Sequence, residues 1–479
     1  MRERTIRQVA ALAGAVPIDD EPIGMGRPAG PDVVIDSRLV TPNAVFVALP
    51  GEHADGHDFI AAAAANGAAA AICTRRTAAP LAHLLVADAE RGLSELARGV
   101  VAEAKASGLA CVGVTGSSGK TSTKDLLGQV LAASAPTVSP RGSFNNEIGV
   151  PLTALRVGDD TRYLVSEMGA RGGGHIAWLC GIVPPDVGVV LNVGRAHLGE
   201  FGSVEAIVAA KGELVEALPE SGWAVLNADD PLVLGMAGRT GAALATFSLA
   251  GEPDAGALRV WAQDVVADEL QRHSFTLRAA GTVRAAVPVT LLGSGRHQVA
   301  NALAAATAAL ALGLPAELIA GALSAATARS AWRMQLMPRA DGVLVVNDAY
   351  NANPDSMRAA LGTVAAMRRP GGRLVAVLGD MLELGADADA EHHALGVLAA
   401  DLGFDVVAVG DFADRIADGV REASGSVRVV ADRDAAVAVA GSDLQPSDVV
   451  VIKASRGLAL DRVADALAAD PAAEQGSDA

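Results

Sequence analysis

The segment from Cys111 to Gln129, which reads CVGVTGSSGKTSTKDLLGQ, constrains the fold of this chain more than any other. It consists of an apolar strand, a glycine-containing turn and a helix that begins at Lys120 and Thr121. The backbone N–H groups of such a turn and the positive end of the helix dipole bind an anion, commonly a phosphate. We therefore expect an α/β fold that has this phosphate-binding loop at its centre.

The loop favours a nucleoside triphosphate as its ligand. Lys120 can reach the terminal phosphates, and the Thr121 hydroxyl can ligate Mg²⁺. The spacing is shorter than in the general P-loop pattern, because Val114 stands where that pattern has its first glycine. A chance GKT sequence on a surface turn is the alternative. The residues expected around the phosphates are Gly116, Ser117, Ser118, Gly119, Lys120, Thr121 and Ser122.

Length and charge limit the domain count and the partners. At 479 residues the chain is too long for one core, and it suggests roughly three domains of about 150 residues each. The net charge of −17 repels nucleic acid, and two tyrosines with four tryptophans offer few stacking surfaces for bases. We expect no nucleic-acid partner. An acidic chain that binds a polyphosphate needs Mg²⁺ to supplement its few cations.

Composition also bears on the compartment. Much of the 51% hydrophobic content is alanine, and no bulky apolar span is long enough to cross a bilayer. The N-terminal sequence MRERTIRQVAALAGAVP is typical of an amphipathic helix rather than a signal peptide. The cysteines Cys73, Cys111 and Cys180 lie among apolar residues, which predicts buried, reduced thiols. We expect a cytoplasmic monomer without a membrane span.

The pattern of strands and helices predicts α/β units in succession. Residues 1–106 are expected to form a small α/β domain, and residues 107–329 a central P-loop domain with a mostly parallel sheet. Residues 330–470 are expected to form a doubly wound, Rossmann-like domain, because continuous apolar strands alternate there with helical segments. Residues 471–479 lack bulky apolar groups and are predicted to be a disordered tail.

Polar residues follow the buried strands of the central domain. Glu167 ends one predicted strand and could hold Mg²⁺ opposite Thr121, and His197 follows the next strand at the same edge, where it could bind a metal ion or a phosphate. The alternatives are a carboxylate that caps the following turn and a structural histidine. Lys211, in the sequence AKGE, resembles a solvated helix lysine that pairs with an acidic neighbour.

The third domain offers a second set of polar residues. Asp348 ends its first strand, and Asn351 lies in YNANP, where asparagines suit a purine or ribose but also mark structural turns. Lys453, Ser455 and Arg456 leave its final strand towards the same edge, where they could bind a carboxylate. The alternative is a basic helix start, which the helix dipole disfavours.

In this order the segments resemble the Mur ligase family of peptidoglycan synthesis over nearly the whole chain. The shortened phosphate-binding loop belongs to that family's pattern. The segments that carry the resemblance are DSRLVTPNAVFVAL, DGHDFI, TGSSGKTSTKD, SFNNEIGVPLT, SEMGA, NVGRAHLGEFGS, AKGE, GRHQVANALAAATAAL, NDAYNANPDSM, VLGDMLELG and KASRG.

The resemblance is strongest to the branch that joins D-alanyl-D-alanine to UDP-N-acetylmuramoyl-tripeptide, and it implies an ATP-dependent ligase. The peptide carboxylate would attack the γ-phosphate of ATP, and the dipeptide amine would then displace phosphate from the acyl phosphate. Positioning and charge neutralisation would suffice, without an enzyme nucleophile. Two Mg²⁺ ions and a carbamylated lysine are the implied cofactors besides ATP.

The resemblance also implies a role for each candidate residue. Lys120, Lys211, His197 and Arg333 would be catalytic, and the metal ligands would be Thr121, Glu167, His197 and Lys211 as a carbamate. ATP would be contacted by Asn301, Arg333, Asp348 and Asn351. The UDP substrate would be contacted by Ser37, Arg38, Asn145 and Asn146. The dipeptide would be contacted by Lys453, Ser455 and Arg456.

Three residues depart from the family pattern. Gln298 replaces an asparagine, Trp332 a glycine before Arg333, and Ala454 the glycine of K-G-S-R. Each departure affects only its local assignment, and the phosphate-binding loop is unaltered.

Other functions stay open from the sequence. The ligase branch that adds the third amino acid typically carries a D-N-P-R motif, which this chain lacks. Folylpolyglutamate synthase shares the loop but has no uridine-binding first domain, and a nucleotide-binding scaffold without activity is the alternative from another class. The sequence does not choose diaminopimelate or lysine as the acceptor's third residue, nor does it exclude D-alanyl-D-lactate as the donor.

Overall fold

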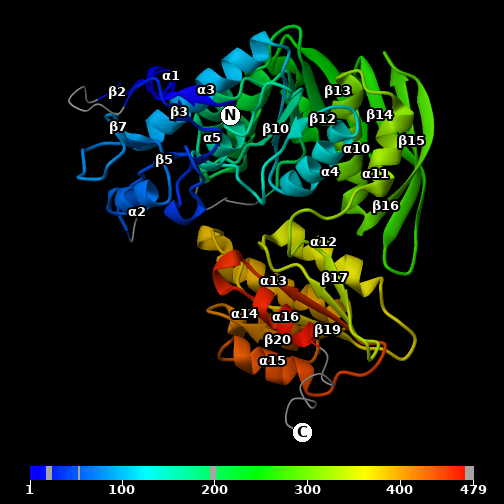
Figure 1. The fold of residues 1–479 in the computed structure, drawn as a ribbon. Coiled ribbons are helices and arrows are strands. Elements are labelled where there is room, and N and C mark those ends of the chain that lie inside the picture. Colours follow the sequence, from blue (N-terminus) through cyan, green and yellow to red (C-terminus); the bar gives the residue numbers. More distant parts are fainter. Residues whose placement is uncertain (18–23, 52–53, 195–200, 470–479) are drawn as a thin grey trace.

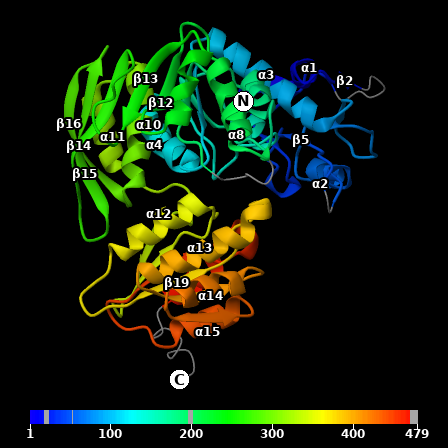
Figure 2. The same ribbon diagram turned by 180° about the vertical axis from the view of Figure 1, so that it is seen from behind.

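The computed structural model describes residues 1–17, 24–51, 54–194 and 201–469. Two sequence predictions fall outside these ranges, namely His197 and the tail 471–479. A first unit lies beside the large central unit, and a third unit lies across from both, as the two opposite views agree (Figures 1 and 2). None of the helices in the described ranges has both the length and the apolarity that a membrane crossing requires.

The first unit is a small sheet covered by helices, as predicted. Strands β7, β6, β5 and β4 are parallel, and β2 adds an antiparallel edge. The strands of this sheet, in spatial order, are β2 (Val16–Pro17), β7 (Ala82–Leu85), β6 (Ala70–Cys73), β5 (Val45–Val47) and β4 (Val33–Val34). The helices are α1 (Ile6–Leu12), α2 (Ile60–Ala65) and α3 (Ala89–Ala106), and short strands β1 (Arg4–Thr5) and β3 (Pro28–Ala29) pair beside them.

The central sheet is mostly parallel, which confirms the predicted fold class. Its order is β16-β15-β14-β13-β12-β11-β8-β10-β9, and all pairings from β14 to β9 are parallel. The parallel strands are β9 (Thr137–Val138), β10 (Tyr163–Glu167), β8 (Ala110–Thr115), β11 (Val187–Val190), β12 (Trp223–Asn227), β13 (Ala243–Ser248) and β14 (Leu258–Ala267). The helices of this unit are α4 (Lys120–Ala132), α5 (Gly149–Ala154), α6 (His175–Ile182), α8 (Val204–Glu216), α9 (Pro231–Leu234), α10 (His297–Ala311) and α11 (Ala316–Ala325).

One part of this sheet was not predicted from the sequence. Strands β15 (Arg272–Gly281) and β16 (Ala285–Ser294) pair antiparallel with β14 and with each other, and they extend the sheet at one side (Figure 1). Their buried and exposed residues alternate, so one face covers α11 and the other meets solvent.

The third unit has the predicted parallel sheet, with one antiparallel strand at its edge. Its strands, in spatial order, are β17 (Gln335–Pro338), β18 (Leu344–Asn347), β22 (Val449–Lys453), β19 (Leu374–Leu378), β20 (Phe404–Val409) and β21 (Val427–Val430). Its helices are α12 (Pro354–Ala365), α13 (Ala388–Asp401), α14 (Ala413–Glu422), α15 (Arg433–Gly441) and α16 (Asp461–Ala468).

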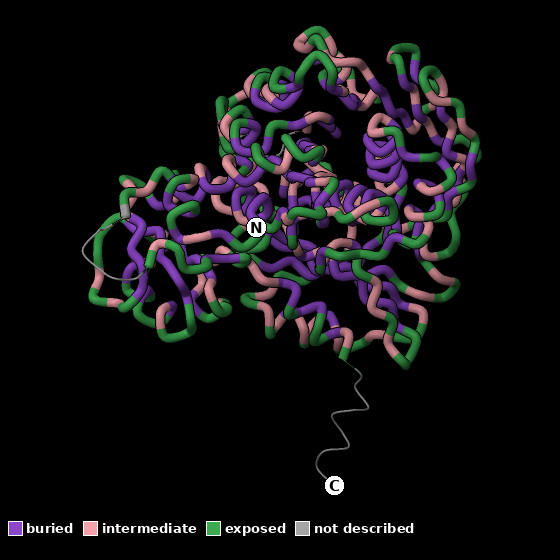
Figure 3. Tube along the Cα trace, turned by 45° about the horizontal axis from the view of Figure 1, so that its top comes forward, coloured by how far each residue is buried: buried purple, intermediate pink, exposed green. Residues whose placement is uncertain are grey.

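The first and central units share an apolar core, whereas the third unit has cores of its own. Buried residues gather in the interior of the molecule, and exposed residues lie on its outer turns (Figure 3). One core continues from the first unit into the central unit, because Leu93 and Leu96 of α3 belong to the same cluster as Ile176 and Leu179 of α6. Among the described residues, the two clusters of the third unit draw their buried members from residues 334–467 alone. The third unit therefore meets the central unit mainly through polar side chains.

Candidate active site

The phosphate-binding loop joins β8 to α4 in a conformation that needs its glycines. Gly119, at the start of α4, has φ +79°, and an added Cβ there would lie 2.5 Å from Asn301 Oδ1. Asn301 reaches this point because the alanine-rich helix α10 packs closely against α4. The Lys120 ammonium donates to Gly116 O at 2.6 Å, so it folds back over the loop. Burial lowers the pKa of Lys120, and Glu167 opposes this shift.

Asn192 braces the loop from the end of the neighbouring strand β11. Its backbone carbonyl accepts from Ser117 N at 3.1 Å, its side-chain Oδ1 accepts from Ser118 N at 2.9 Å, and its Nδ2 donates to Ser118 O at 3.2 Å. Asn192 is not among the residues predicted from the sequence. Its position directly after a buried strand beside the loop strand was the available signal.

Thr121, Glu167, Asn145 and Arg333 converge beside the loop. Thr121 Oγ1 donates to Glu167 Oε1 at 3.2 Å, and Asn145 Nδ2 donates to the same oxygen at 2.8 Å. Arg333 Nη2, from the third unit, donates to Thr121 Oγ1 at 2.8 Å. Within the described residues, the second carboxylate oxygen of Glu167 is buried without a hydrogen-bond partner. Because Mg²⁺ prefers oxygen ligands, this unpaired oxygen and the Thr121 hydroxyl fit the predicted metal site.

Lys211 lies on α8 and is buried, with 4% of its surface exposed. The interpretation of Lys211 as a solvated helix lysine is therefore wrong. Burial and the nearby positive charge of Lys120 lower its pKa from 10.5 to about 7. The described residues give Lys211 neither a hydrogen bond nor an ion pair, and they contain no cluster of three metal-ligating His, Cys, Asp or Glu side chains. A neutral amine in such surroundings can react with CO₂.

The third unit supplies the other wall of the site. Lys453 is buried and pairs with Asp348 Oδ2 at 2.7 Å, and its ammonium also donates to Asn351 O at 2.9 Å. Asp348 Oδ1 accepts from Met334 N at 2.9 Å, which ties down the segment that carries Arg333. Lys453 therefore orders the predicted ATP-binding residues in this structure, and its charge is already neutralised by Asp348.

These walls enclose a cavity of about 310 Å³. The cavity brings together most of the residues predicted for ATP and the metal, from parts of the chain that are far apart in the sequence. The predicted residues that line it are Ser117, Ser118, Gly119, Lys120, Thr121, Ser122, Asn145, Glu167, Asn301, Arg333, Asp348, Asn351 and Lys453.

Several predicted residues lie outside this cavity. Ser37 and Arg38 are in the first unit, where Arg38 is exposed and pairs with Asp36 at 2.6 Å. Asn146 accepts from Gly149 N at 2.9 Å near the start of α5. The Ser455 hydroxyl accepts from Leu382 N at 2.9 Å, and Arg456 pairs with Asp461 at 2.7 Å.

The three departures from the family pattern are accommodated locally. Gln298 Oε1 accepts from Asn301 Nδ2 at 3.1 Å. Ala454 is fully buried, and it faces Gly379, where an added Cβ would lie 2.9 Å from the Ala454 methyl group. Trp332 has φ +60°, a left-handed conformation that favours glycine.

The Trp332 ring links the final motif to the phosphate-binding loop. The Arg456 guanidinium lies over it at 4.1 Å, and the ring stacks on Tyr350 at a centroid distance of 6.5 Å. The Arg333 guanidinium lies over Tyr350 at 4.1 Å, and the Tyr350 hydroxyl is hydrogen-bonded to Ser143 of the central unit. We call Arg456, Trp332, Tyr350 and Arg333 the aromatic stack.

Comparison with known proteins adds independent information. Residues 32–103 match the catalytic domain of the Mur ligase family, residues 114–309 the Mur ligase middle domain, and residues 332–456 the Mur ligase glutamate ligase domain. The UDP-N-acetylmuramoyl-tripeptide–D-alanyl-D-alanine ligase of Mycobacterium tuberculosis strain CDC 1551 is 45% identical, over 98% of this chain and 98% of its own length.

Solved structures agree with this comparison. The UDP-N-acetylmuramoylalanyl-D-glutamyl-2,6-diaminopimelate–D-alanyl-D-alanyl ligase of Acinetobacter baumannii has a TM-score of 0.83 and 30% identity, covering 98% of each chain. MurF ligase from Thermotoga maritima, solved in complex with ADP, has a TM-score of 0.77 and 30% identity, covering 91% of this chain and 97% of its own. With all its units matched and a relative of this identity along nearly its full length, the chain belongs to the Mur ligase family.

Proposed function

We propose that this chain joins D-alanyl-D-alanine to UDP-N-acetylmuramoyl-tripeptide, with ATP converted to ADP and phosphate. The observation that carries the proposal is the direct contact between Arg333 of the third unit and Thr121 of the phosphate-binding loop, at 2.8 Å beside Glu167. This contact forms one polar site from two units, as a ligase of two substrates and a nucleotide needs. The name of the 45% identical mycobacterial relative supports the choice of substrates.

The chemistry follows from the poor reactivity of a carboxylate. An oxygen of the peptide carboxylate attacks the γ-phosphorus of ATP, the bond to ADP breaks, and an acyl phosphate forms. The neutral amine of the dipeptide then attacks the acyl carbon, and phosphate leaves. Lys120 and Arg333 would neutralise the charge on the transferring phosphoryl group, and closure of the third unit would exclude water from the acyl phosphate.

We infer that Thr121 and Glu167 hold Mg²⁺ and that Lys211, as a carbamate, and His197 hold a second ion. The unpaired Glu167 oxygen supports the first assignment, and His197 lies outside the described residues. Bound Mg²⁺ would neutralise the polyphosphate. The burial and lowered pKa of Lys211 support the carbamate. A carbonyl signal from ¹³C-bicarbonate that is absent in Lys211→Ala would support it, whereas an unmodified amine and full activity of Lys211→Ala would refute it.

The remaining roles rest on the family pattern. We propose that adenosine is contacted by Asn301, Asp348 and Asn351. The UDP substrate would be contacted by Ser37, Arg38, Asn145 and Asn146, and the dipeptide by Lys453, Ser455 and Arg456. Exposure of Arg38 and Arg456 supports their availability, whereas Lys453 would have to exchange its bond to Asp348. We also propose a cytoplasmic monomer, in line with the buried, unpaired Cys73, Cys111 and Cys180.

Phosphate release by the purified protein tests the function. Release should require ATP, Mg²⁺, UDP-N-acetylmuramoyl-tripeptide and D-alanyl-D-alanine together, and omission of any one should abolish it. Release that needs no dipeptide would contradict the proposal, and so would nucleotide binding without turnover, which is the behaviour of a scaffold. Turnover with a free amino acid and a dipeptide acceptor would identify the branch that adds the third residue.

A further inference from the structure

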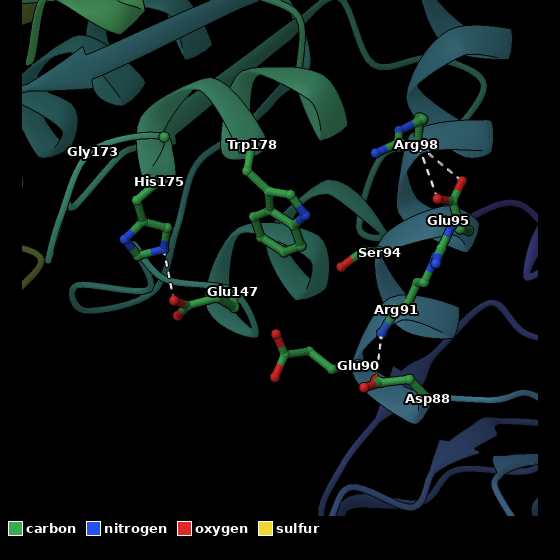
Figure 4. Close-up of a pocket in the computed structure, with 11 residues that line it drawn as sticks. Asp88, Glu90, Arg91, Ser94, Glu95, Arg98, Glu147, Gly173, His175 and Trp178 are labelled. Atoms are coloured by element: carbon green, nitrogen blue, oxygen red, sulfur yellow. Dashed lines mark hydrogen bonds and ion pairs between the residues drawn. The ribbon is translucent and has the colours of Figure 1, made fainter. Parts of the chain in front are cut away.

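A second, larger cavity lies between the first and central units. It has a volume of about 640 Å³ and is lined by α3, by the start of α6 and by the segment that contains Glu147 (Figure 4). We call it the α3–α6 pocket. The residues that matter for its chemistry are Glu90 and Ser94 of α3, Glu147, and His175 and Trp178 of α6.

The pocket holds a carboxylate that is not neutralised. The other acidic groups have partners: Glu147 pairs with His175 at 2.7 Å, Glu95 with Arg98 at 2.9 Å, and Asp88 accepts from Arg91 N at 3.0 Å. Glu90 has no hydrogen bond or ion pair to any described residue, and its carboxylate extends from α3 towards Glu147 and Trp178 (Figure 4). Burial, followed by the negative charges of Glu147 and Asp88, raises the pKa of Glu90.

A second, independent feature points to a ligand. Ser94 is 2% exposed, and its hydroxyl has no hydrogen-bond partner among the described residues. Figure 4 shows this hydroxyl directed from α3 into the pocket. A buried hydroxyl without a partner is costly, so a ligand that donates a hydrogen bond to it would remove a penalty.

Two arginines, Arg91 and Arg98, also line the pocket, and Arg98 is paired with Glu95, so the preference for a cation over an anion is local to Glu90 and Ser94. The N–H groups at the start of α6 are already satisfied, since Glu213 accepts from Gly174 N at 2.5 Å and from Ala177 N at 2.9 Å. The face of the Trp178 ring can contact an aliphatic stem or a cation. A primary ammonium on an aliphatic chain would pair with Glu90 and donate to Ser94.

Two segments connect this pocket to the candidate active site. Asn145 donates to Glu167 in the active site, and Glu147, two residues further on, lines the pocket, a span of at most about 7 Å. On α8, Lys211 lies close enough to Lys120 of the phosphate-binding loop for that charge to lower its pKa, and Glu213, two residues further on, holds the start of α6. A peptide whose terminal carboxylate lies beside the phosphate-binding loop could therefore place a side chain in the pocket.

We propose that the α3–α6 pocket binds the side-chain ammonium group of the acceptor's third residue, with Glu90 as its counter-ion and Ser94 as a hydrogen-bond acceptor. This inference rests on the proposed function. The acceptor named for the Acinetobacter relative ends in 2,6-diaminopimelate, which carries such a group. The pocket would thus select the tripeptide by its third side chain, apart from the chemistry at the phosphate-binding loop.

Two acceptors that differ only in the amine test this proposal. One carries 2,6-diaminopimelate as its third residue and the other 2-aminopimelate, which keeps both carboxylates. For the wild-type protein, loss of the amine should raise the acceptor KM at least tenfold, while the KM values of ATP and dipeptide stay unchanged. Glu90→Gln should reduce the ratio of the two acceptor KM values to less than threefold, because it weakens the binding of the amine-bearing acceptor only.

Matched variants separate binding from folding. Ser94→Ala should raise the thermal midpoint, since it removes an unpartnered buried hydroxyl, and yet raise the KM of the amine-bearing acceptor. Glu103→Gln removes the same charge from the far end of α3, where the carboxylate pairs with Arg4 at 2.7 Å, and should keep the wild-type ratio. Equal KM values for both acceptors in the wild type, or a wild-type ratio in Glu90→Gln, would overturn the proposal and leave the ligase function standing. If neither acceptor supported phosphate release, both the pocket proposal and the proposed ligase function would be overturned.

Discussion

Lys120 carries much of the proposed chemistry with one side chain. Among the described residues its ammonium has one hydrogen bond, to Gly116 O in the same loop, so its removal breaks no hydrogen bond between separate elements. We expect Lys120→Ala to keep the wild-type thermal midpoint and to lower kcat at least 100-fold, because about 3 kcal/mol of charge stabilisation at the phosphoryl group is lost. Phosphate release and a melting curve on the same preparation measure both. Ligation within threefold of wild type would contradict the phosphate assignment.

Lys211 should make the stability of the protein depend on pH. Its pKa is about 7 in the folded state and 10.5 in the unfolded chain, so between these values the unfolded chain binds more protons. In buffer free of CO₂, the free energy of unfolding contributed by this group should therefore rise as the pH increases from about 7 to 10. Urea titrations across this range should show a steeper rise for wild type than for Lys211→Met. Bicarbonate should flatten the wild-type curve by converting the amine, and identical slopes for both proteins would contradict the shifted pKa.

At the scale of elements, the succession of strand, phosphate-binding loop and helix could be predicted because its residues are contiguous in the sequence. Strand β19 can be recognised in the sequence because its residues LVAVL are all buried, and a buried parallel strand is an unbroken apolar run. Strands β15 and β16 were missed because strands were sought as unbroken apolar runs, whereas their buried residues alternate with polar ones such as Arg278 and Thr290, which is the pattern of a half-buried strand. The contact of Arg333 with Thr121 joins residues 212 positions apart, and no local pattern specifies it.

The bracing of the loop by β11 is a property of two elements together. We expect Asn192→Ala to raise the KM for ATP about five- to thirtyfold, because two side-chain hydrogen bonds to Ser118, each worth about 1 kcal/mol, are lost. The KM of the UDP substrate should not change. Asn227→Ala is the matched control, since that amide donates to Leu191 O at the end of β11 and does not touch the loop. Equal effects of the two substitutions on ATP would show that Asn192 acts only through the sheet.

At the scale of the whole molecule, the units are joined by different kinds of contact. The first unit shares an apolar core with the central unit, whereas the third unit meets it through the aromatic stack and the polar groups around Thr121. Polar interfaces between domains permit relative motion. The third unit can therefore move with Arg333 and Arg456 attached to it, while the phosphate-binding loop and the α3–α6 pocket stay fixed to each other.

Arg456 lies at the outer end of the aromatic stack, where the dipeptide would enter. Its guanidinium rests on Trp332 and is half-exposed, and one of its nitrogens pairs with Asp461, so its remaining N–H groups are available to the dipeptide carboxylate. We expect Arg456→Ala to raise the dipeptide KM at least tenfold, equivalent to about 1.4 kcal/mol, with the KM values of ATP and UDP substrate near wild type.

Trp332→Gly should raise the dipeptide KM less, because it removes the support of the guanidinium but suits the left-handed backbone at that position. Arg456→Lys should not restore the affinity, since an ammonium cannot bind a carboxylate through two parallel bonds. Steady-state kinetics with each substrate varied in turn distinguish the outcomes. Equal losses for all three substrates would assign Arg456 to closure of the third unit, and no loss would remove it from the site.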